Sequence, residues 1–302
     1  MARFARYDRF GGPDVIEVVD LPEPHPGPGQ MRVRVRFAGL NPIDYKIFGG
    51  LGDYGVVLPS GVGQDFSGDV DEVGEGATGF AVGDAVLGAI RHQGAGDFVI
   101  ADPGSVVVRK PEGLAYELAG ALGVAGRTAW ASVAAIDPQP GETVFVSAAA
   151  GGVGILAAQL VLRAGASVVG TAGEANHSFL EALGVTPVVY GDGLVERLRE
   201  AAPGGYQAAL DNHGPESIDA ALELGIPLSR INTIAARGYR DAVGAGAQQA
   251  SPDDFARLAD LVASGELKLP IDSQYPLERI REAYAHLMGR HVRGKVLLDL
   301  GA

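Results

Sequence analysis

The sequence predicts a mixed α/β protein in which an irregular β-barrel or sandwich is joined to a doubly wound parallel sheet. In roughly the first 120 residues, short apolar segments are separated by glycine clusters about every 8–12 residues, which is typical of an all-β arrangement. Further along the chain, short apolar segments alternate with longer segments of helical periodicity, which is typical of βαβ units. A chain of 302 residues, 47% of them hydrophobic, is long enough for two domains that each bury a core.

The N-terminal part contains one clear strand. Between Met31 and Phe37, apolar residues at the odd positions alternate with arginines at the even positions. This alternation predicts a strand with one buried and one solvated face, as in an antiparallel sheet. We expect further short strands at 69–73, 85–87 and 98–101.

The middle of the chain predicts a parallel sheet. The expected strands cover 143–148, 167–170, 187–190, 208–211 and 231–234, and the expected helices cover 153–164, 178–183, 194–201, 217–224 and 252–264. The last segment predicts a helix at 277–288 and a closing strand at 295–300, which we expect to return to the first domain.

Composition limits the classes of function. The chain has no cysteine, which excludes disulfides, thiol catalysis and cysteine-ligated zinc. A net charge of −13 argues against a nucleic-acid surface, and no apolar run reaches the ~18 residues of a membrane span. The first residues lack the apolar core of a signal peptide. We therefore expect a cytoplasmic protein that acts on small molecules and binds neither nucleic acid nor a membrane.

A glycine-containing turn at 148–154 predicts a dinucleotide site. Ala149, Gly151 and Gly154 take the three positions of the GxGxxG template, between an expected strand and an expected helix. A missing side chain at the second position lets backbone N–H groups approach a pyrophosphate, and the helix that begins at Gly152 directs its positive end there. The alternative is a tight turn with a purely structural role.

The choice between NADPH and NADH depends on the end of the second strand of this unit. No acid that could bind a ribose 2′-hydroxyl occurs before Glu174, and no basic residue follows within reach of a 2′-phosphate. Thr171, Asn176 and His177 are the polar candidates. This pattern favours NADPH, with NADH as the alternative.

Several motifs occur in the order found in one known family. They are AAAGGVG at 148–154, GLNPID at 39–44, GRTAW at 126–130, ASG at 263–265 and RGKV at 293–296. Together they resemble the zinc-independent, quinone-oxidoreductase branch of the medium-chain dehydrogenase/reductase family. The resemblance implies a GroES-like β-barrel domain at 1–122 and 266–302, a Rossmann domain at 123–265, a cleft that holds NADPH, and a homodimer.

The resemblance also assigns individual residues. It implies that Asn41 lies near the nicotinamide, that Thr128 contacts the cofactor and that Thr171 supplies a hydroxyl at the ribose end. The pyrophosphate turn would comprise Ala149, Gly151, Gly152 and Val153. The chain departs from the branch at Ala175, where an arginine is usual, at Arg127, where a leucine is usual, and at His213, in a segment that is usually apolar.

The chain lacks the residues that a catalytic metal site or the short-chain reductase mechanism requires. None of the six histidines forms an HExxH motif or an i, i+4 pair, and Gly-Gln-Asp stands at 63–65 where zinc relatives carry Gly-His-Glu. None of the nine tyrosines has a lysine four residues later. We therefore expect no metal cofactor.

Hydride transfer to a conjugated carbonyl needs a group that stabilises and protonates the developing oxyanion. Tyr45, Lys46 and Tyr54 are the candidate donors, each with an alternative role in packing or at the surface. The Asn41 amide suits a carboxamide or a substrate oxygen. Arg127 and His213 are candidate substrate contacts. The alternative for Arg127 is a pair with a structural acid, and His213 is more typical of a satisfied polar residue. Asp44 and Asp211 are more typical of a helix cap and a strand end.

These observations predict an NAD(P)H-dependent reductase that transfers hydride to a quinone or an α,β-unsaturated ketone without a metal. An enoyl-thioester reductase and a biosynthetic tailoring enzyme are alternatives on the same fold. A non-catalytic NADPH-binding redox sensor or structural protein is the alternative from another class.

Overall fold

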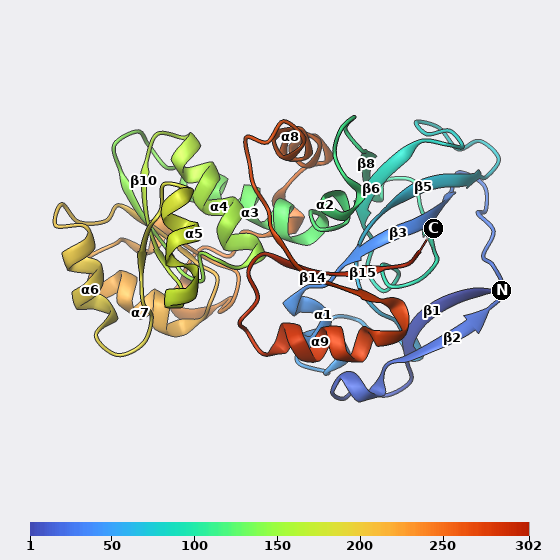
Figure 1. The fold of residues 1–302 in the computed structure, drawn as a ribbon, viewed down its shortest axis with the longest axis horizontal. Helices are drawn as coiled ribbons and strands as arrows, with labels where there is room; N and C mark the ends of the chain where they lie inside the picture. Colours follow the sequence, from blue (N-terminus) through green and yellow to red (C-terminus); the bar gives the residue numbers. More distant parts are fainter. Residues whose placement is uncertain (302) are drawn as a thin grey trace. The chain divides into compact units, whose positions relative to one another are not determined.

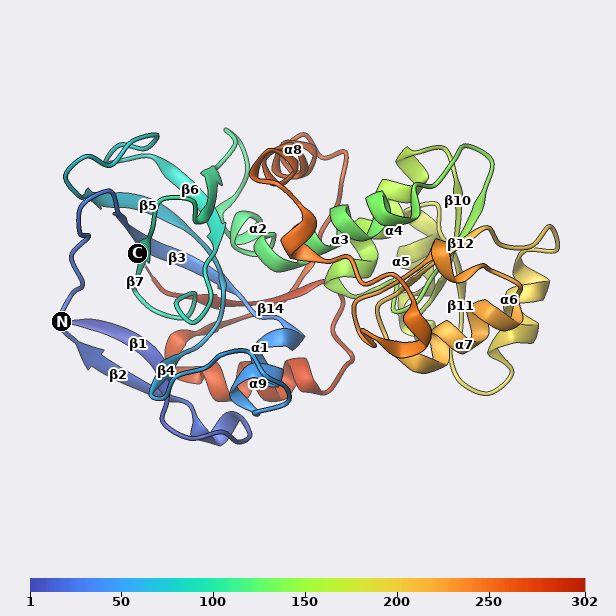
Figure 2. The ribbon, with the colours of Figure 1, turned by 180° about the vertical axis from the view of Figure 1, so that it is seen from behind.

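The computed structural model describes residues 1–301 and confirms a mixed α/β fold (Figure 1, Figure 2). Contacts divide the chain into two compact units. Unit 1 comprises Met1–Val124, Phe255–Glu266 and the segment from Pro270 to the C-terminal end, and unit 2 comprises Ala125–Asp254 and Leu267–Leu269. The predicted domains, 1–122 with 266–302 and 123–265, differ from this division mainly at 255–265, which the contacts assign to unit 1.

Unit 1 is built around two sheets. Seven strands form the larger sheet, in which β14-β15-β3-β5-β6-β8 are neighbours in that order and β7 also pairs with β3, while β2-β1-β4 form the smaller sheet. The strands are β1 (Ala2–Tyr7), β2 (Glu17–Leu21), β3 (Met31–Gly39), β4 (Ser60–Gly61), β5 (Asp65–Val73), β6 (Ala85–Ala89), β7 (Phe98–Ala101), β8 (Val106–Arg109), β14 (Ile271–Pro276) and β15 (Lys295–Asp299). The helices are α1 (Pro42–Phe48), α2 (Tyr116–Gly120), most of α8 (Pro252–Ala263) and α9 (Ile280–Met288).

Strand β3 shows how the predicted alternation works and where it fails. Val33 and Val35 are fully buried, as expected, and β3 pairs antiparallel with β5, β7 and β15. The prediction of a uniformly solvated arginine face is wrong at Arg32, which is only 8% exposed. Its guanidinium lies over the Phe98 ring and donates to both oxygens of Asp71, so the charge is paired where it is buried.

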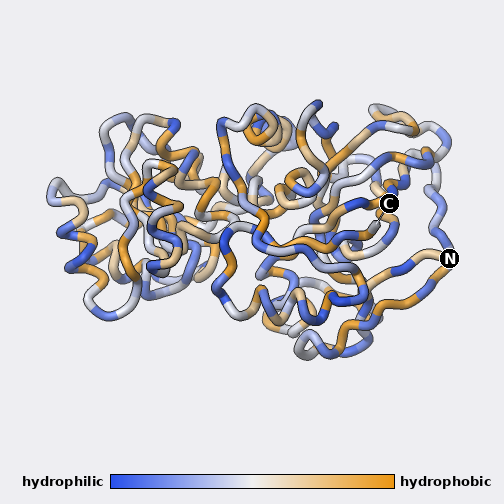
Figure 3. Tube along the Cα trace, in the orientation of Figure 1, coloured by the Kyte–Doolittle hydropathy of each residue, from blue (hydrophilic) through white to orange (hydrophobic). Residues whose placement is uncertain are grey.

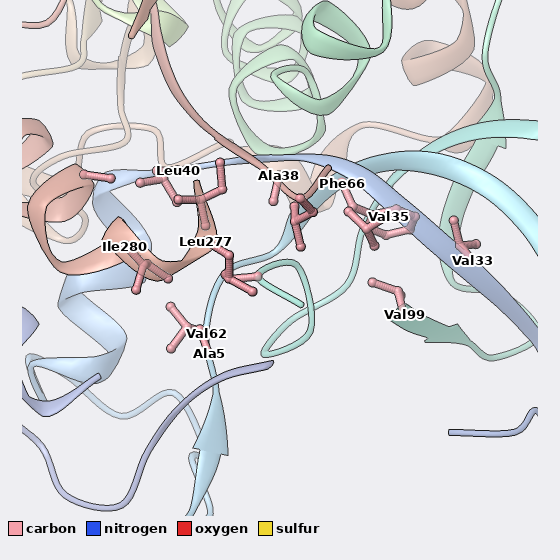
Figure 4. Packing of buried hydrophobic residues seen from close by; sticks show 14 of the residues in the cluster. Ala5, Val33, Val35, Ala38, Leu40, Val62, Phe66, Val99, Leu277 and Ile280 are labelled. Atoms are coloured by element: carbon pink, nitrogen blue, oxygen red, sulfur yellow. The ribbon is translucent and has the colours of Figure 1, made fainter. Parts of the chain in front are cut away.

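The C-terminal segment belongs to unit 1. Strand β15 lies between β14 and β3 in the larger sheet, and Leu298 stands opposite Ala38. Leu277 and Ile280, from the start of the C-terminal helical segment, belong to the same buried core as β3, β5 and β7 (Figure 4). This core therefore joins residues from the two ends of the chain.

Unit 2 contains the predicted parallel sheet, with the order β11-β10-β9-β12-β13. The strands are β9 (Thr143–Val146), β10 (Ser167–Thr171), β11 (Thr186–Val188), β12 (Ala208–Asp211) and β13 (Ile231–Thr233). The helices are most of α3 (Gly123–Ile136), α4 (Gly152–Arg163), α5 (His177–Ala182), α6 (Leu194–Ala201) and α7 (Pro215–Glu223).

The strand order of unit 2 reverses direction at β9. Strands β10 and β11 follow on one side of β9, and β12 and β13 follow on the other, so right-handed crossovers place helices on both faces of the sheet. Hydrophobic residues recur along these strands, whereas hydrophilic residues are frequent on helices such as α6 and on the loops (Figure 3). In such sheets the crevice at the carboxyl ends of the strands, where the order reverses, is the usual position of a ligand.

Within residues 1–301, every helix is too short or too polar to span a bilayer.

Candidate functional site

The turn that follows β9 is fixed by Thr171, the last residue of β10. The Thr171 hydroxyl accepts a hydrogen bond from the Ala148 N–H (3.0 Å), and its carbonyl accepts one from the Ala149 N–H (2.9 Å). The Gly151 N–H then donates to the Ala148 carbonyl (3.0 Å), while Ala148 adopts a left-handed conformation with φ +47°. The turn is therefore rigid before any ligand binds.

Two glycines of this turn have different reasons to be glycine. A Cβ on Gly154 would lie 2.2 Å from the Ala148 carbonyl oxygen and 2.8 Å from the Ala149 Cα, so the fold itself requires glycine there. A Cβ on Gly151 would meet only the Ala148 carbonyl oxygen, at an ordinary 3.4 Å. Glycine at 151 is thus not needed by the protein's own packing, and it leaves space in front of α4.

The beginning of α4 has the properties of an anion site. Gly151 is its N-cap and has no side chain, so no side chain caps the first turn of this 12-residue helix. The first N–H groups of a helix have no partner within the helix, and the helix dipole makes this end positive. The space at Gly151 and these N–H groups together fit a pyrophosphate.

A buried aspartate joins the ends of three strands beside this turn. Asp211 is 2% exposed and accepts hydrogen bonds from the Ser147 hydroxyl (3.2 Å) and the Thr233 hydroxyl (2.6 Å). It also accepts from the N–H groups of His213 (2.9 Å) and Gly214 (2.8 Å). Asp211 therefore holds the loops in place, in the strand-end role expected for it.

The other predicted residues of unit 2 lie in different settings. Thr128 is buried, and Arg127 is 8% exposed and donates to the Ala250 carbonyl (3.3 Å). The His213 ring is exposed and lies 3.7 Å from the carboxylate of Glu216, a surface acid. Asn176 and His177 follow β10, and a ring nitrogen of His177 lies 3.3 Å from the Ala172 carbonyl oxygen.

Tyr190 was not among the expected residues. It follows β11, beside the end of β10, and its hydroxyl lies 4.0 Å from the position that a Cβ on Gly173 would take. Its side chain is 52% exposed, which is unusual for a tyrosine at a strand end. The expected strand at 187–190 contained it, but only the adjacency of β10 and β11 brings its hydroxyl near Gly173.

In unit 1, Asn41 belongs to a buried polar cluster. Its amide nitrogen donates to Asp65 (2.9 Å) and to the Gly39 carbonyl (3.2 Å), and its amide oxygen accepts from Lys295 (2.6 Å). Lys295 is 3% exposed and also donates to Asp65 (3.2 Å) and to the Leu40 carbonyl (2.9 Å). Asn41 therefore already uses both amide donors and its amide oxygen inside unit 1.

Asp65 and Lys295 were not predicted as partners. Asp65 is fully buried, and its second oxygen accepts the Val124 N–H (2.7 Å). Burial raises the pKa of Asp65, and the Lys295 ammonium opposes that rise. The available signal was Lys295, a charged residue directly before the apolar run Val296–Leu298 in the expected strand at 295–300.

Asp44 caps α1, as expected, because it accepts the Asn41 N–H at 2.8 Å. It is only 3% exposed, and burial, reinforced by the nearby Asp65 carboxylate, raises its pKa to about 7.

The three candidate proton donors lie on α1 and the loop after it. Tyr45 is half-buried and packs against the core of unit 1, which agrees with its alternative role as a packing residue. Lys46 and Tyr54 are also half-buried, and a Cβ on Gly52 would lie 3.2 Å from the Tyr54 ring.

Comparison with known proteins agrees with this architecture. The model of the alcohol dehydrogenase GroES-like domain matches residues 27–136, and that of the zinc-binding dehydrogenase matches residues 183–298. The chain is 28% identical to the chloroplast envelope quinone oxidoreductase homolog of Arabidopsis thaliana over 97% of both chains. It is similar to the solved quinone oxidoreductase of Coxiella burnetii, with a TM-score of 0.87 and 29% identity over 99% of both chains. It is also 32% identical to a segment of the polyketide synthase GfsB of Streptomyces halstedii, over 88% of this chain and 5% of that protein.

Proposed function

Since the chain belongs to the quinone-oxidoreductase-like branch of the medium-chain dehydrogenase/reductase family, we propose that it is an NADPH-dependent reductase of quinones or α,β-unsaturated ketones. The observation that carries this proposal is the open space at Gly151 before the uncapped beginning of α4. A bound nicotinamide cofactor would supply a hydride to an electrophilic carbon of the substrate.

The residues of unit 2 would hold the cofactor. The turn of Ala149, Gly151, Gly152 and Val153 would bind the pyrophosphate. The N–H groups of Gly152 and Val153, at the beginning of α4, would donate to it, while Ala149 and Gly151 shape the turn through their N–H bonds to the Thr171 and Ala148 carbonyls. Thr128 would contact the cofactor as well. Asn176, His177 and the exposed Tyr190 hydroxyl would bind the ribose end, in place of the arginine that Ala175 replaces.

The residues of unit 1 would complete the reaction. Tyr45, Lys46 or Tyr54 would donate a proton to the oxygen on which negative charge develops. Asn41 would lie near the nicotinamide, where the hydrogen bonds of its amide to Asp65 and Lys295 hold its side chain in one position. Arg127 and His213, in unit 2, would contact the substrate.

The donor set of unit 1 does not fit a catalytic zinc ion. The chain has no cysteine, Gln64 offers an amide in place of an imidazole, and Asp65 is paired with the Lys295 ammonium. We therefore propose that hydrogen-bond donors of side chains, in place of a zinc ion, stabilise the oxyanion that develops on the substrate.

The test is a titration of the protein with NADPH and with NADH, followed by nicotinamide fluorescence, and then an assay of NADPH oxidation with quinones and enones. NADPH is expected to bind at least ~10-fold more tightly, about 1.4 kcal/mol. Equal binding of NADH would overturn the preference for NADPH. Tight binding without turnover on any acceptor would instead support the non-catalytic sensor.

The similarity to a polyketide synthase segment favours one second candidate, an enoyl-thioester reductase. Turnover of crotonyl thioesters without turnover of free enones would identify it. The expected homodimer is tested separately by sedimentation equilibrium.

A further inference from the structure

A small cavity lies beneath α1 in unit 1, apart from the dinucleotide turn. It is lined by Tyr7 of β1, by Asp44 and Phe48 of α1, by Gln64 and by His92. The cavity has room for about one water molecule. Its lining combines aromatic walls with a hydroxyl, a carboxyl and an amide, so it is polar enough to hold water.

The Tyr7 hydroxyl is buried beside this cavity. Tyr7 is 2% exposed, and its hydroxyl forms no hydrogen bond with any protein group within residues 1–301. Ser60 stands opposite Tyr7 in the β1–β4 pair, and its side chain opposes the rise that burial causes in the Tyr7 pKa, but the two hydroxyls do not form a hydrogen bond of normal geometry. A buried hydroxyl without a partner is unfavourable, so Tyr7 points to a ligand that can bind it.

Asp44 presents the second polar group of the cavity. One carboxyl oxygen accepts the Asn41 N–H (2.8 Å) and the Tyr284 hydroxyl (3.2 Å). The other oxygen has only a long contact with the Gln64 amide nitrogen, at 3.4 Å. This second oxygen therefore has capacity for a further, shorter hydrogen bond.

Both protonation states of Asp44 are accessible near neutral pH. Burial and the Asp65 carboxylate raise its pKa to about 7, while the Lys295 ammonium, the Asn41 N–H and the Gln64 amide oppose the rise. The titratable or charged groups on the elements around it are Tyr7, Asp65, His92, Tyr284 and Lys295. Burial lowers the pKa of His92 and raises that of Tyr284, which favours their neutral forms.

We propose that one internal water molecule occupies this cavity, bridges the Tyr7 hydroxyl and the Asp44 carboxyl, and makes Asp44 a buried proton-exchanging group. When Asp44 is ionised, the water donates to its free oxygen. When a proton from solvent binds that oxygen, the new O–H donates to the same water, which has two donors and two acceptors. The water thus satisfies both states, and the proposal stands independently of the reductase activity.

The first test is a high-resolution crystal structure of the full chain. We expect one ordered water within hydrogen-bond distance of both the Tyr7 hydroxyl and the Asp44 carboxyl. A cavity without water in that structure overturns the proposal, whatever the variants below do.

The second test is the stability of Tyr7→Phe in urea across pH 5–9. If the hydroxyl anchors a bridging water, its removal lowers the urea midpoint and weakens support for the ionised carboxylate. The pH at which stability changes then moves upward by roughly one unit, a tenfold change in proton affinity. If the hydroxyl binds nothing, its removal raises the midpoint and leaves the pH profile in place, which also overturns the proposal.

Two further variants make the second test specific. Asp44→Asn should remove the pH dependence of the urea midpoint, which would assign that dependence to Asp44. Tyr206→Phe removes a buried hydroxyl that donates to the Leu198 carbonyl (2.6 Å) in unit 2, so it lowers the midpoint without moving the pH profile.

Discussion

At the scale of single residues, Lys295 and Asp65 form a buried ion pair that also holds Asn41. The two residues are 230 positions apart in the chain, and both are at most 3% exposed. Removal of one partner leaves an uncompensated charge in a medium where it cannot be solvated. We therefore expect that the loss of either partner strongly destabilises unit 1, although the contact between them, at 3.2 Å, is not short.

Lys295→Met is expected to destabilise the protein by about 3–5 kcal/mol, because it leaves the Asp65 carboxylate buried without its counter-charge. Urea unfolding measures this. The matched control is Arg199→Met, which removes an exposed pair with Glu223 and should leave the midpoint almost unchanged. Equal effects of the two substitutions would contradict the importance assigned to the buried pair.

The two glycines of the dinucleotide turn allow a paired prediction. Gly154→Ala places a methyl group 2.2 Å from a carbonyl oxygen and should cost about 1–3 kcal/mol of stability through overpacking. Gly151→Ala should keep the thermal midpoint but weaken NADPH binding at least ~10-fold, since the methyl group enters the space before α4. Thermal unfolding and fluorescence titration on the same samples separate the two effects. Unchanged NADPH affinity in Gly151→Ala would show that the space serves no ligand.

At the scale of elements, the end of β10 determines the shape of the turn after β9. Thr171→Val keeps the side-chain shape but leaves the half-buried Ala148 N–H without an acceptor, at a cost of about 1–3 kcal/mol. Because the turn loosens, NADPH binding should weaken as well. Thr171→Ser restores the hydroxyl and should recover most of both losses. A Val variant that binds NADPH normally would mean that the turn is held by its backbone alone.

Most elements of unit 2 were predictable because each carries its own periodicity. The expected helix at 153–164 is observed as α4 at Gly152–Arg163, and the expected helix at 194–201 matches α6. Strand β14 (Ile271–Pro276) was missed, because its alternating residues are only half-buried and mostly polar. Its strand character comes from pairing with β15, which is a tertiary effect.

The candidate site was predictable only in part, for a related reason. The dinucleotide turn is local, so its residue types and spacing are visible in the sequence. The Asn41–Asp65–Lys295 cluster joins three distant segments, and charged residues read alone suggest a solvated surface. Only the packing of β3, β5 and β15 shows that these charges are buried together.

At the scale of the whole molecule, Asp44 makes stability depend on pH. Its pKa in the folded state is about 7, above the 3.8 of an unperturbed aspartate, so the folded state binds more protons between these values. Stability should therefore fall as the pH rises from about 4 towards 7, by as much as about 1.4 kcal/mol per pH unit from this group. Urea unfolding at pH 5 and at pH 8 measures the slope. Asp44→Asn should flatten it, and an unchanged slope in that variant would assign it to other groups.

The position of β15 between β14 and β3 in the larger sheet has a consequence for synthesis on the ribosome. Nearly all of unit 2 precedes residue 255, so its sheet can form while the rest of the chain is still being made. Strand β3 emerges early and pairs with β5 and, at Met31–Arg34, with β7, but Phe37–Gly39 wait for Leu297, Leu298 and Asp299. During that interval this end of β3 has an open edge, and an unpaired strand edge is the usual starting point of aggregation. A chain that stops before β15 should therefore yield insoluble protein, and the nascent chain would depend on chaperones until β15 is released.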